Sequence, residues 1–343
     1  MTLTAQPSTP DRARSIEGVL CIVVGMLLFV GQDAMMKYLL GPYPVWMLIF
    51  IRSVITLLVL TPVILHLGAP HRLFTPLWPW HLLRAALFAV GFSLFYAAFP
   101  YMGLAEVSTI FFAAPLITSL LATVFLKEKI GIHRSLALLV GFAGVVIAMQ
   151  PTGDAFQWVA ILPFICAVTY AISQIIMRKI GDRESTLTVG LYTIVFAGIL
   201  IAPGGWLVNQ VIDVGPEMRH LRSDWPVPPL GHLPLLALLG LTGMVGYMLL
   251  SRAYQVASAT LVAPFDYTYL PFATLLAFFL WNEVPTWSTL AGMLLIVSSG
   301  LYTGYRELLQ DRPDDAPPPT ADAAFAPGNP TAPLAMGPDE GTA

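Results

Sequence analysis

Four ionisable side chains lie inside long apolar stretches of the sequence: Asp33, Arg52, Glu106 and Asp266. A charge at the centre of a membrane-spanning helix costs about 2.5 to 3.5 kcal/mol, so such a group usually faces a cavity or a partner. The sequence contains neither an HExxH motif nor a GxSxG motif, which would indicate hydrolytic chemistry. We therefore examine this set for solute or ion binding, and we expect no catalytic residue.

Asp33 and Arg52 are expected at similar depths in neighbouring helices. Asp33 comes shortly before the end of the first apolar run. Arg52 lies about 12 Å into the second run at 1.5 Å per residue, counted from the same side. We predict that the two form an ion pair. This pair would either fasten the two helices together or let the Arg52 guanidinium bind a carboxylate or phosphate of the solute.

Asp266 stands between Pro264 and Pro271 in the segment APFDYTYLP. Proline removes backbone hydrogen bonds, and free carbonyl groups within a membrane are tolerated only beside protein or a watery cavity. A buried carboxylate here could load and release a proton during transport. The alternative is an acid at the rim that is hydrogen-bonded to a neighbouring helix. Glu106, near the start of its run, is expected to complement a helix dipole.

Amides and aromatic rings at membrane depth complete the candidate site. Gln32 and Gln174 are candidate hydrogen-bonding residues. Buried tyrosine hydroxyls need partners, and aromatic rings can stack on a flat or cationic solute. Packing against helices or lipid is the alternative role for these rings. The aromatic candidates are Tyr96, Phe112, Tyr192, Tyr247 and Tyr267.

The composition excludes a soluble protein. Of the 343 residues, 57% are hydrophobic and only 11% are charged. The net charge of -3 offers no basic surface for a nucleic acid. Cys21 and Cys166 have no CxxC partner, and all six histidines are expected at loops or helix ends. We therefore expect no metal and no cofactor.

Ten apolar runs are long enough to cross a bilayer, which takes roughly 20 residues in a helix. The sequence therefore predicts an all-α membrane protein with ten transmembrane helices. The runs are 17–38, 44–66, 79–99, 103–126, 133–150, 156–178, 186–207, 233–252, 258–281 and 286–305.

The two halves of the sequence resemble each other. A shift of 155 residues places Glu128 on Glu283, each at the end of a proline-bearing run, and a smaller shift aligns the first run with the sixth. We therefore expect two five-helix repeats, 17–150 and 156–305. Because five is odd, the second repeat must enter the membrane from the opposite side, as in many alternating-access carriers.

Several segments also resemble a known family. They include GQDAMMKYL, STIFFAAPLITSLLATVFLKEKI and ATLVAPFDYTYLPFATLLAFFLWNEVP. They are similar to the ten-helix branch of the drug/metabolite transporter superfamily, which is built from two EamA-type repeats. The resemblance implies a central cavity and secondary transport of a small organic metabolite, such as an amino-acid-like compound, riboflavin or S-adenosylmethionine.

The distribution of Lys and Arg predicts the orientation, because cytoplasmic loops carry the excess. With the N-terminus inside, most of the 17 Lys and Arg residues, Arg84 among them, fall on the cytoplasmic side. We expect a protein of the cytoplasmic (inner) membrane with both termini in the cytoplasm. The tails are 1–16 and 306–343, and the composition of the second predicts disorder.

Other classes of membrane protein are less well supported. An intramembrane transferase would need a paired His or Asp constellation, which the apolar runs lack. A channel or a non-transporting sensor would not require inverted copies. Glycines at 141, 144, 300 and 304 permit close helix packing, either within the bundle or at the seam of a homodimer. The expected partners are a small-molecule solute and membrane lipid, and no nucleic acid.

Overall fold

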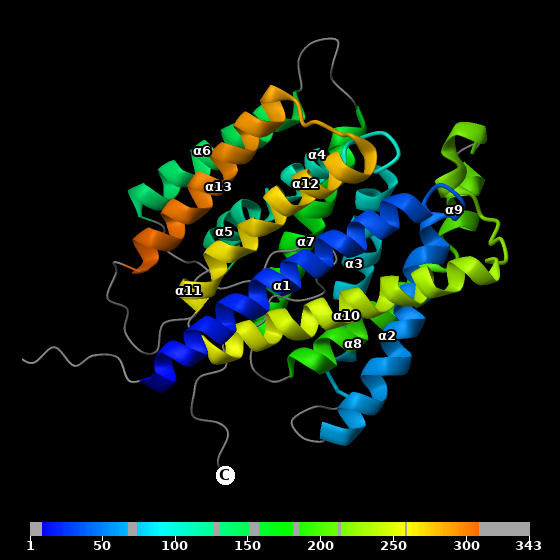
Figure 1. The fold of residues 1–343 in the computed structure, drawn as a ribbon, viewed down its shortest axis with the longest axis horizontal. Coiled ribbons are helices and arrows are strands. Elements are labelled where there is room, and N and C mark those ends of the chain that lie inside the picture. Colours follow the sequence, from blue (N-terminus) through cyan, green and yellow to red (C-terminus); the bar gives the residue numbers. More distant parts are fainter. Residues whose placement is uncertain are drawn as a thin grey trace, which may run out of the picture.

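In a computed structural model of the protein, every regular element of the described residues is a helix (Figure 1). The described residues are 9–67, 74–125, 131–150, 158–180, 185–211, 214–257 and 259–308. The helices of the first half are α1 (Thr9–Leu39), α2 (Val45–Leu67), α3 (Trp78–Ala97), α4 (Leu104–Phe111), α5 (Ala114–Phe125) and α6 (Ile132–Met149). Those of the second half are η1 (Trp158–Ala160), α7 (Ile161–Ile180), α8 (Thr186–Ile201), α9 (Gly204–Val211), η3 (Pro216–Leu221), η4 (Leu230–His232), α10 (Leu233–Val256), α11 (Ala259–Val262), η5 (Ala263–Thr268), α12 (Tyr269–Trp281) and α13 (Trp287–Leu308).

The helices confirm an all-helical membrane fold. Lipid offers no hydrogen bonds, so a chain that crosses it must pair its backbone groups internally. Among the described residues, seven helical stretches are long and apolar enough to cross a bilayer, and an eighth is obtained if α8 and α9, which meet at 43°, count as one. The seven are Ala13–Leu39, Val45–His66, Trp78–Ala97, Leu104–Phe125, Ile132–Met149, Trp158–Met177 and Leu230–Val256.

The first and last helices extend into the segments that were expected to be tails. α1 begins at Thr9, within the stretch expected as an N-terminal tail, and α13 continues to Leu308. Residues 309–343, on which the prediction of disorder falls, lie outside the described residues, as does Glu128.

Prolines interrupt two of the apolar runs. Pro115 has no amide hydrogen and so cannot bond to the carbonyl of Phe111, where α4 ends before α5 begins. Pro271 likewise cannot bond to the carbonyl of Tyr267, which lies in the 3-10 turn η5. Asp266 lies in the same 3-10 helix, η5, between α11 and α12.

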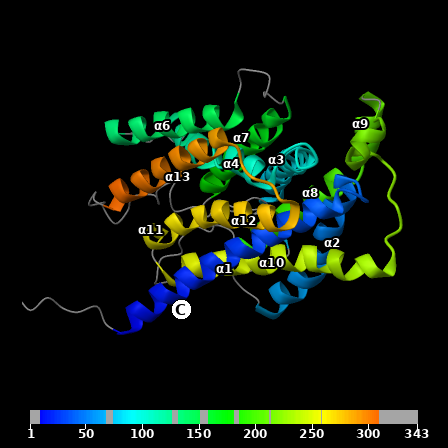
Figure 2. The same ribbon diagram turned by 45° about the horizontal axis from the view of Figure 1, so that its top comes forward.

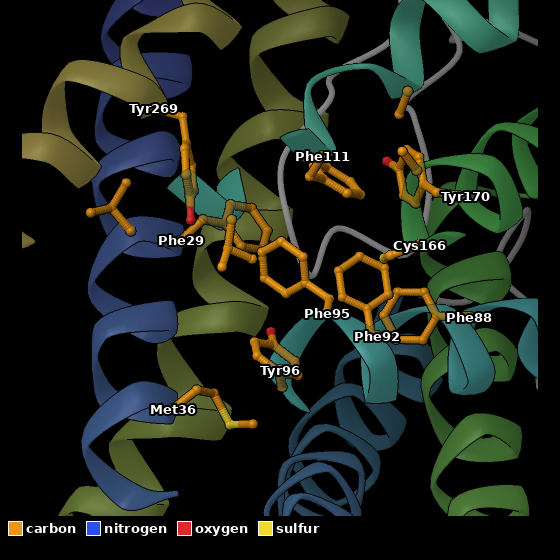
Figure 3. Packing of buried hydrophobic residues seen from close by; sticks show 14 of the residues in the cluster. Phe29, Met36, Phe88, Phe92, Phe95, Tyr96, Phe111, Cys166, Tyr170 and Tyr269 are labelled. Atoms are coloured by element: carbon orange, nitrogen blue, oxygen red, sulfur yellow. The ribbon is translucent and has the colours of Figure 1, made fainter. Parts of the chain in front are cut away.

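Helices from the two halves of the chain pack against each other. α1 lies along α10, α3 along α7 and α8, α2 along α8, and α6 along α13. The α1–α10 and α6–α13 pairs are side by side in both ribbon views (Figures 1 and 2). Figure 3 shows part of the buried aromatic core, which includes Phe88, Phe92 and Phe95 of α3, Phe111 of α4 and Tyr170 of α7.

Glycine allows the close approach of α6 and α13. A Cβ on Gly292 would lie 2.5 Å from the carbonyl oxygen of Gly144, and a Cβ on Gly141 would lie 2.8 Å from the Oγ of Ser299. Both distances are too short for a side chain, so these glycines serve packing within the bundle. Gly304 has nothing within 4 Å of its Cβ position.

Candidate functional site

A buried carboxylate, Asp33, joins the two halves of the protein. Asp33 on α1 is 0% exposed. Its Oδ1 accepts a hydrogen bond from the hydroxyl of Tyr96 on α3, at 3.0 Å, and its Oδ2 accepts one from the hydroxyl of Tyr269 on α12. The Tyr269 hydroxyl in turn accepts from the Oγ of Ser108 on α4, at 3.4 Å. Three helices therefore meet at one carboxylate, and α4 joins them through Tyr269.

Arg52 enters the same network through Tyr96. Its Nη1 donates to the Tyr96 hydroxyl at 3.2 Å, and its guanidinium carbon lies 5.7 Å from the centre of the Phe88 ring. Arg52 is 3% exposed, and its Nε and Nη2 have no hydrogen-bond partner among the described residues. A buried polar group without a partner costs about 1 to 3 kcal/mol or more, so this edge of the guanidinium is suited to an added acceptor.

The predicted direct ion pair between Asp33 and Arg52 does not form among the described residues. The hydroxyl of Tyr96 lies between them, donating to Asp33 and accepting from Arg52. Spacing in the sequence predicts the depth of Asp33 and Arg52 along α1 and α2. It does not show that a side chain of another helix, Tyr96 of α3, lies between them. Gln32 also donates to Tyr96, at 3.5 Å, and its Oε1 lies 1.8 Å from where a Cβ of Gly243 on α10 would be.

Asp266 forms its own hydrogen bond nearby. It is 3% exposed, and its Oδ2 accepts from the hydroxyl of Tyr254 on α10, at 3.2 Å. Next to it in sequence, Tyr267 packs against Phe112 with ring centroids 5.6 Å apart. Phe112 also lies 5.8 Å from the ring of Tyr269, so the candidates of the ninth run border the Asp33 network.

A second buried cation lies at the other end of α3. Arg84 is 0% exposed; its Nε donates to the carbonyl of Ser173 at 3.3 Å and its Nη1 to the hydroxyl of Thr193 at 3.4 Å. The charge distribution places Arg84 on the cytoplasmic side, and the structure shows that its side chain is buried against α7 and α8 rather than exposed at the surface. His81 is in the first turn of α3, as expected for a helix end, but it is buried and stacked on Tyr192 at 5.1 Å.

The structure thus groups the sequence candidates unevenly. Gln32, Asp33, Arg52 and Tyr96 share one hydrogen-bonded network, whereas the remaining candidates surround it or lie towards Arg84. Gln174 follows Ser173 on α7, and Tyr247 packs against Gly190 of α8. Sequence reasoning did not identify Ser108 or Arg84 as residues of the site. Two features of the sequence could have indicated these residues: the hydroxyl groups within the apolar runs, and an arginine within the third run.

A cavity of about 560 Å³ opens at the end of the bundle where α1 and α12 finish. We call it the mouth cavity. At its wall, Lys37 forms an ion pair with Glu283 and donates to the carbonyl of Met102 at 3.1 Å. The other carboxylate oxygen of Glu283 accepts from the backbone amide of Leu104, at 3.1 Å. Glu283 therefore connects three segments of the protein.

Glu106 also lines the mouth cavity. Its Oε2 accepts from the backbone amide of Gly103 at 3.2 Å, which confirms its expected place at the N-terminus of α4. His220 lies on the same wall, edge-on to Tyr101, and burial lowers the pKa of its imidazole to about 4. Among the described residues, no group of three His, Cys, Asp or Glu side chains could hold a metal ion.

The apolar helices and the polar network enclosed by them define a multi-pass membrane protein with a charged interior. The sequence profile of the EamA-like transporter family matches residues 16–150 and again residues 157–304. The protein therefore belongs to the EamA-like transporter family, within the drug/metabolite transporter superfamily.

Proteins with known roles resemble it along nearly their whole lengths. An S-adenosylmethionine uptake transporter of Rickettsia bellii is 27% identical, over 84% of this chain and 94% of that protein. A riboflavin transporter of Vibrio cholerae is also 27% identical, over 87% and 96% respectively. A pseudopaline exporter of Pseudomonas aeruginosa is 26% identical, over 82% and 93%. One solved crystal structure shares the fold with a TM-score of 0.50 and 19% identity, covering 86% of this chain and 99% of that chain.

Proposed function

We propose that this protein is a secondary carrier that moves a small organic metabolite across the cytoplasmic membrane by alternating access. The observation that carries the proposal is the buried network of Asp33, Tyr96 and Arg52, at a point where helices of both halves meet. A charged network within a membrane is retained where it serves a solute or ion pathway. The names of the relatives, which include an uptake transporter and an exporter, agree with transport in either direction.

The proposed architecture has ten transmembrane helices in two inverted five-helix repeats, 17–150 and 156–305. The double match of one family profile supports two copies. In the two repeats α1 corresponds to α7, α2 to α8, α3 to α10 and α6 to α13. Helix packing supports this symmetry, because the contact of α1 with α10 is matched by the contact of α7 with α3. In addition, α2 packs on α8 and α6 packs on α13, so each of these helices contacts its own counterpart. Such an exchange of contacts is what a two-fold axis in the membrane plane produces. Rocking of one copy against the other would then open the network to each side alternately.

Both termini are proposed to be cytoplasmic, because the basic residues outside the helices lie mainly on that side. The mouth cavity then faces outward. The Arg84 cluster lies nearer the cytoplasm than the Asp33 network, since Arg84 comes early in α3 and Tyr96 comes at its end.

The solute is proposed to carry an anionic group together with a flat ring. Nε and Nη2 of Arg52 form one edge of the guanidinium plane, and a carboxylate or phosphate can accept two parallel hydrogen bonds from such an edge. Phe88 and Tyr96 lie beside the same guanidinium, and aromatic rings can stack on a flat solute. S-adenosylmethionine, with its carboxylate and adenine ring, has both features.

Solute counterflow in proteoliposomes tests this function. Vesicles preloaded with unlabelled S-adenosylmethionine should transiently accumulate the labelled compound, because a carrier exchanges solute whereas an enzyme or a sensor does not. Arg52→Lys keeps the positive charge but loses the two parallel donors of the guanidinium, Nε and Nη2. It should therefore lower the rate of counterflow about tenfold or more. The matched control is Arg252→Lys, since Arg252 is an exposed partner of Glu17.

Two results would contradict the proposal. One is the absence of counterflow for wild-type protein with both S-adenosylmethionine and riboflavin. The other is an Arg52→Lys variant that exchanges solute as fast as Arg252→Lys, which would remove the Arg52 edge from the solute site.

A further inference from the structure

The wall of the mouth cavity contains an ion pair whose lysine lies on the same helix as Asp33. Lys37 lies four residues after Asp33, so the two side chains share one face of α1. Lys37 is bound to Glu283 at the start of the α12–α13 connection and to Met102 in the α3–α4 connection. The side chains of Lys37 and Glu283 are only 10% and 27% exposed. This ion pair is therefore mostly buried, and it lies in the wall of the mouth cavity on the face of α1 that also carries Asp33.

The cavity itself offers one charge of each sign that is not used by this ion pair. Arg219 lines it and has no ion-pair partner among the described residues. Glu106 lines it too, and among the described residues its hydrogen bond is the one that Oε2 accepts from the backbone amide of Gly103. The guanidinium of Arg219 can bind a carboxylate, and the carboxylate of Glu106 can bind an ammonium or sulfonium group. Together they suit an amphoteric molecule, one that carries both an anionic and a cationic group.

Flat side chains border the same cavity. Trp281 and Tyr101 line it, and the imidazole of His220 lies edge-on to Tyr101 with ring centroids 5.5 Å apart. The rings give the cavity apolar walls on which a planar group can stack. At about 560 Å³ it is within the size of small-molecule sites, which run from about 300 to 1,000 Å³.

We propose that the mouth cavity is a second solute site, where a flat amphoteric molecule binds before it reaches the Asp33 network. Its carboxylate binds Arg219, its cationic group binds Glu106, and its ring lies against Trp281. The ion pair of Lys37 and Glu283 forms the floor of this site and keeps the bound molecule from the deeper network. The inference rests on the proposed function for the view that the two sites take the same solute, but binding in the cavity does not require transport.

Equilibrium binding to purified protein in lipid nanodiscs, where both faces are accessible, tests this inference. The probe is S-adenosylmethionine, and quenching of tryptophan fluorescence reports binding beside Trp281. Wild-type protein should show quenching that disappears in Trp281→Phe. Arg219→Gln should weaken the binding about tenfold, as expected for one lost charge-assisted contact. The matched control is Arg222→Gln, because Arg222 is in the same connection but does not line the cavity.

Methylthioadenosine provides the chemical control, since it has the adenosine ring but neither carboxylate nor ammonium group. It should bind at least about tenfold more weakly than S-adenosylmethionine if charges of both signs are recognised. Equal binding of the two compounds would overturn the inference, as would equal binding by Arg219→Gln and Arg222→Gln.

The Arg52→Lys variant separates this site from the deeper one. Quenching that depends on Arg219 should persist in Arg52→Lys, even though the counterflow of this variant is lowered. If wild-type protein fails to exchange solute but still shows binding that depends on Arg219, the proposed transport function falls while the cavity site stands. If counterflow occurs without any binding that depends on Arg219, the cavity site falls and the transport function stands.

Discussion

The hydroxyl of Tyr96 lies 3.0 Å from Oδ1 of Asp33 and so joins α3 to α1 at the centre of a buried network. The same oxygen accepts a hydrogen bond from Arg52. One phenol therefore connects an acid and a base that do not touch each other among the described residues. Asp33 keeps a second donor, Tyr269, from the other half of the chain. A change of position in either half would alter the hydrogen bonds of this carboxylate.

Removal of the Tyr96 hydroxyl should destabilise the protein. Tyr96→Phe leaves the ring in place but leaves the Nη1 of Arg52 without its acceptor and Asp33 with one donor fewer. The expected loss is about 1 to 3 kcal/mol of unfolding free energy, because buried polar groups lose their partners. Thermal unfolding in detergent would measure it, with Tyr38→Phe as the control at a 58% exposed position. Equal melting temperatures for the two variants would contradict the role of this hydroxyl.

Contact between α6 and α13 predicts a different outcome for two glycines of the same helix. Gly292→Ala places a methyl group 2.5 Å from the carbonyl oxygen of Gly144, and overpacking of this kind costs about 1 to 3 kcal/mol. Gly304→Ala meets nothing within 4 Å and should be neutral or stabilise the helix by about 1 kcal/mol at most. Thermal unfolding of both variants would compare them. A Gly292→Ala protein as stable as Gly304→Ala would show that the helices are further apart.

The buried imidazole of His220 should make the stability of the protein depend on pH. Burial lowers the pKa of its imidazole to about 4, whereas the pKa in the unfolded chain is about 6.5. Between these values the unfolded state binds more protons, so the contribution of His220 is complete above about pH 6.5 and is lost as the pH falls towards 4. Melting temperatures measured between these pH values should fall with acidity less steeply in His220→Asn than in wild type. The control is the same substitution at an exposed histidine, His133→Asn.

Asp266 provides a test of ion coupling. We predict that Asp266→Asn abolishes accumulation of solute driven by a proton gradient, because the amide cannot load and release a proton, while solute exchange at equilibrium continues. Asp224→Asn, in an exposed part of the 214–232 stretch, is the matched control. Uptake into proteoliposomes with and without a pH gradient would measure both activities. Accumulation that is unchanged in Asp266→Asn would remove this carboxylate from the coupling step.

The sequence was sufficient to predict the membrane class and its all-helical character, although two of the apolar runs that were expected to be single helices are broken near prolines. These properties are local: the length of an apolar run sets whether it can cross a bilayer, and a missing amide hydrogen interrupts a helix wherever it occurs. The depth of Asp33, Arg52 and Asp266 along their helices followed from the same counting. The family was also recognisable, because its characteristic segments are continuous in the chain.

Only the tertiary structure decided which of these side chains meet. The distance along a helix predicts depth, but the rotation of each helix about its axis depends on packing against helices far away in sequence. For this reason Tyr96 could not be placed between Asp33 and Arg52 beforehand, nor Arg84 inside the bundle. The ion pair of Lys37 with Glu283 joins residues 246 positions apart, and such a contact exists only once the two halves of the chain have packed together.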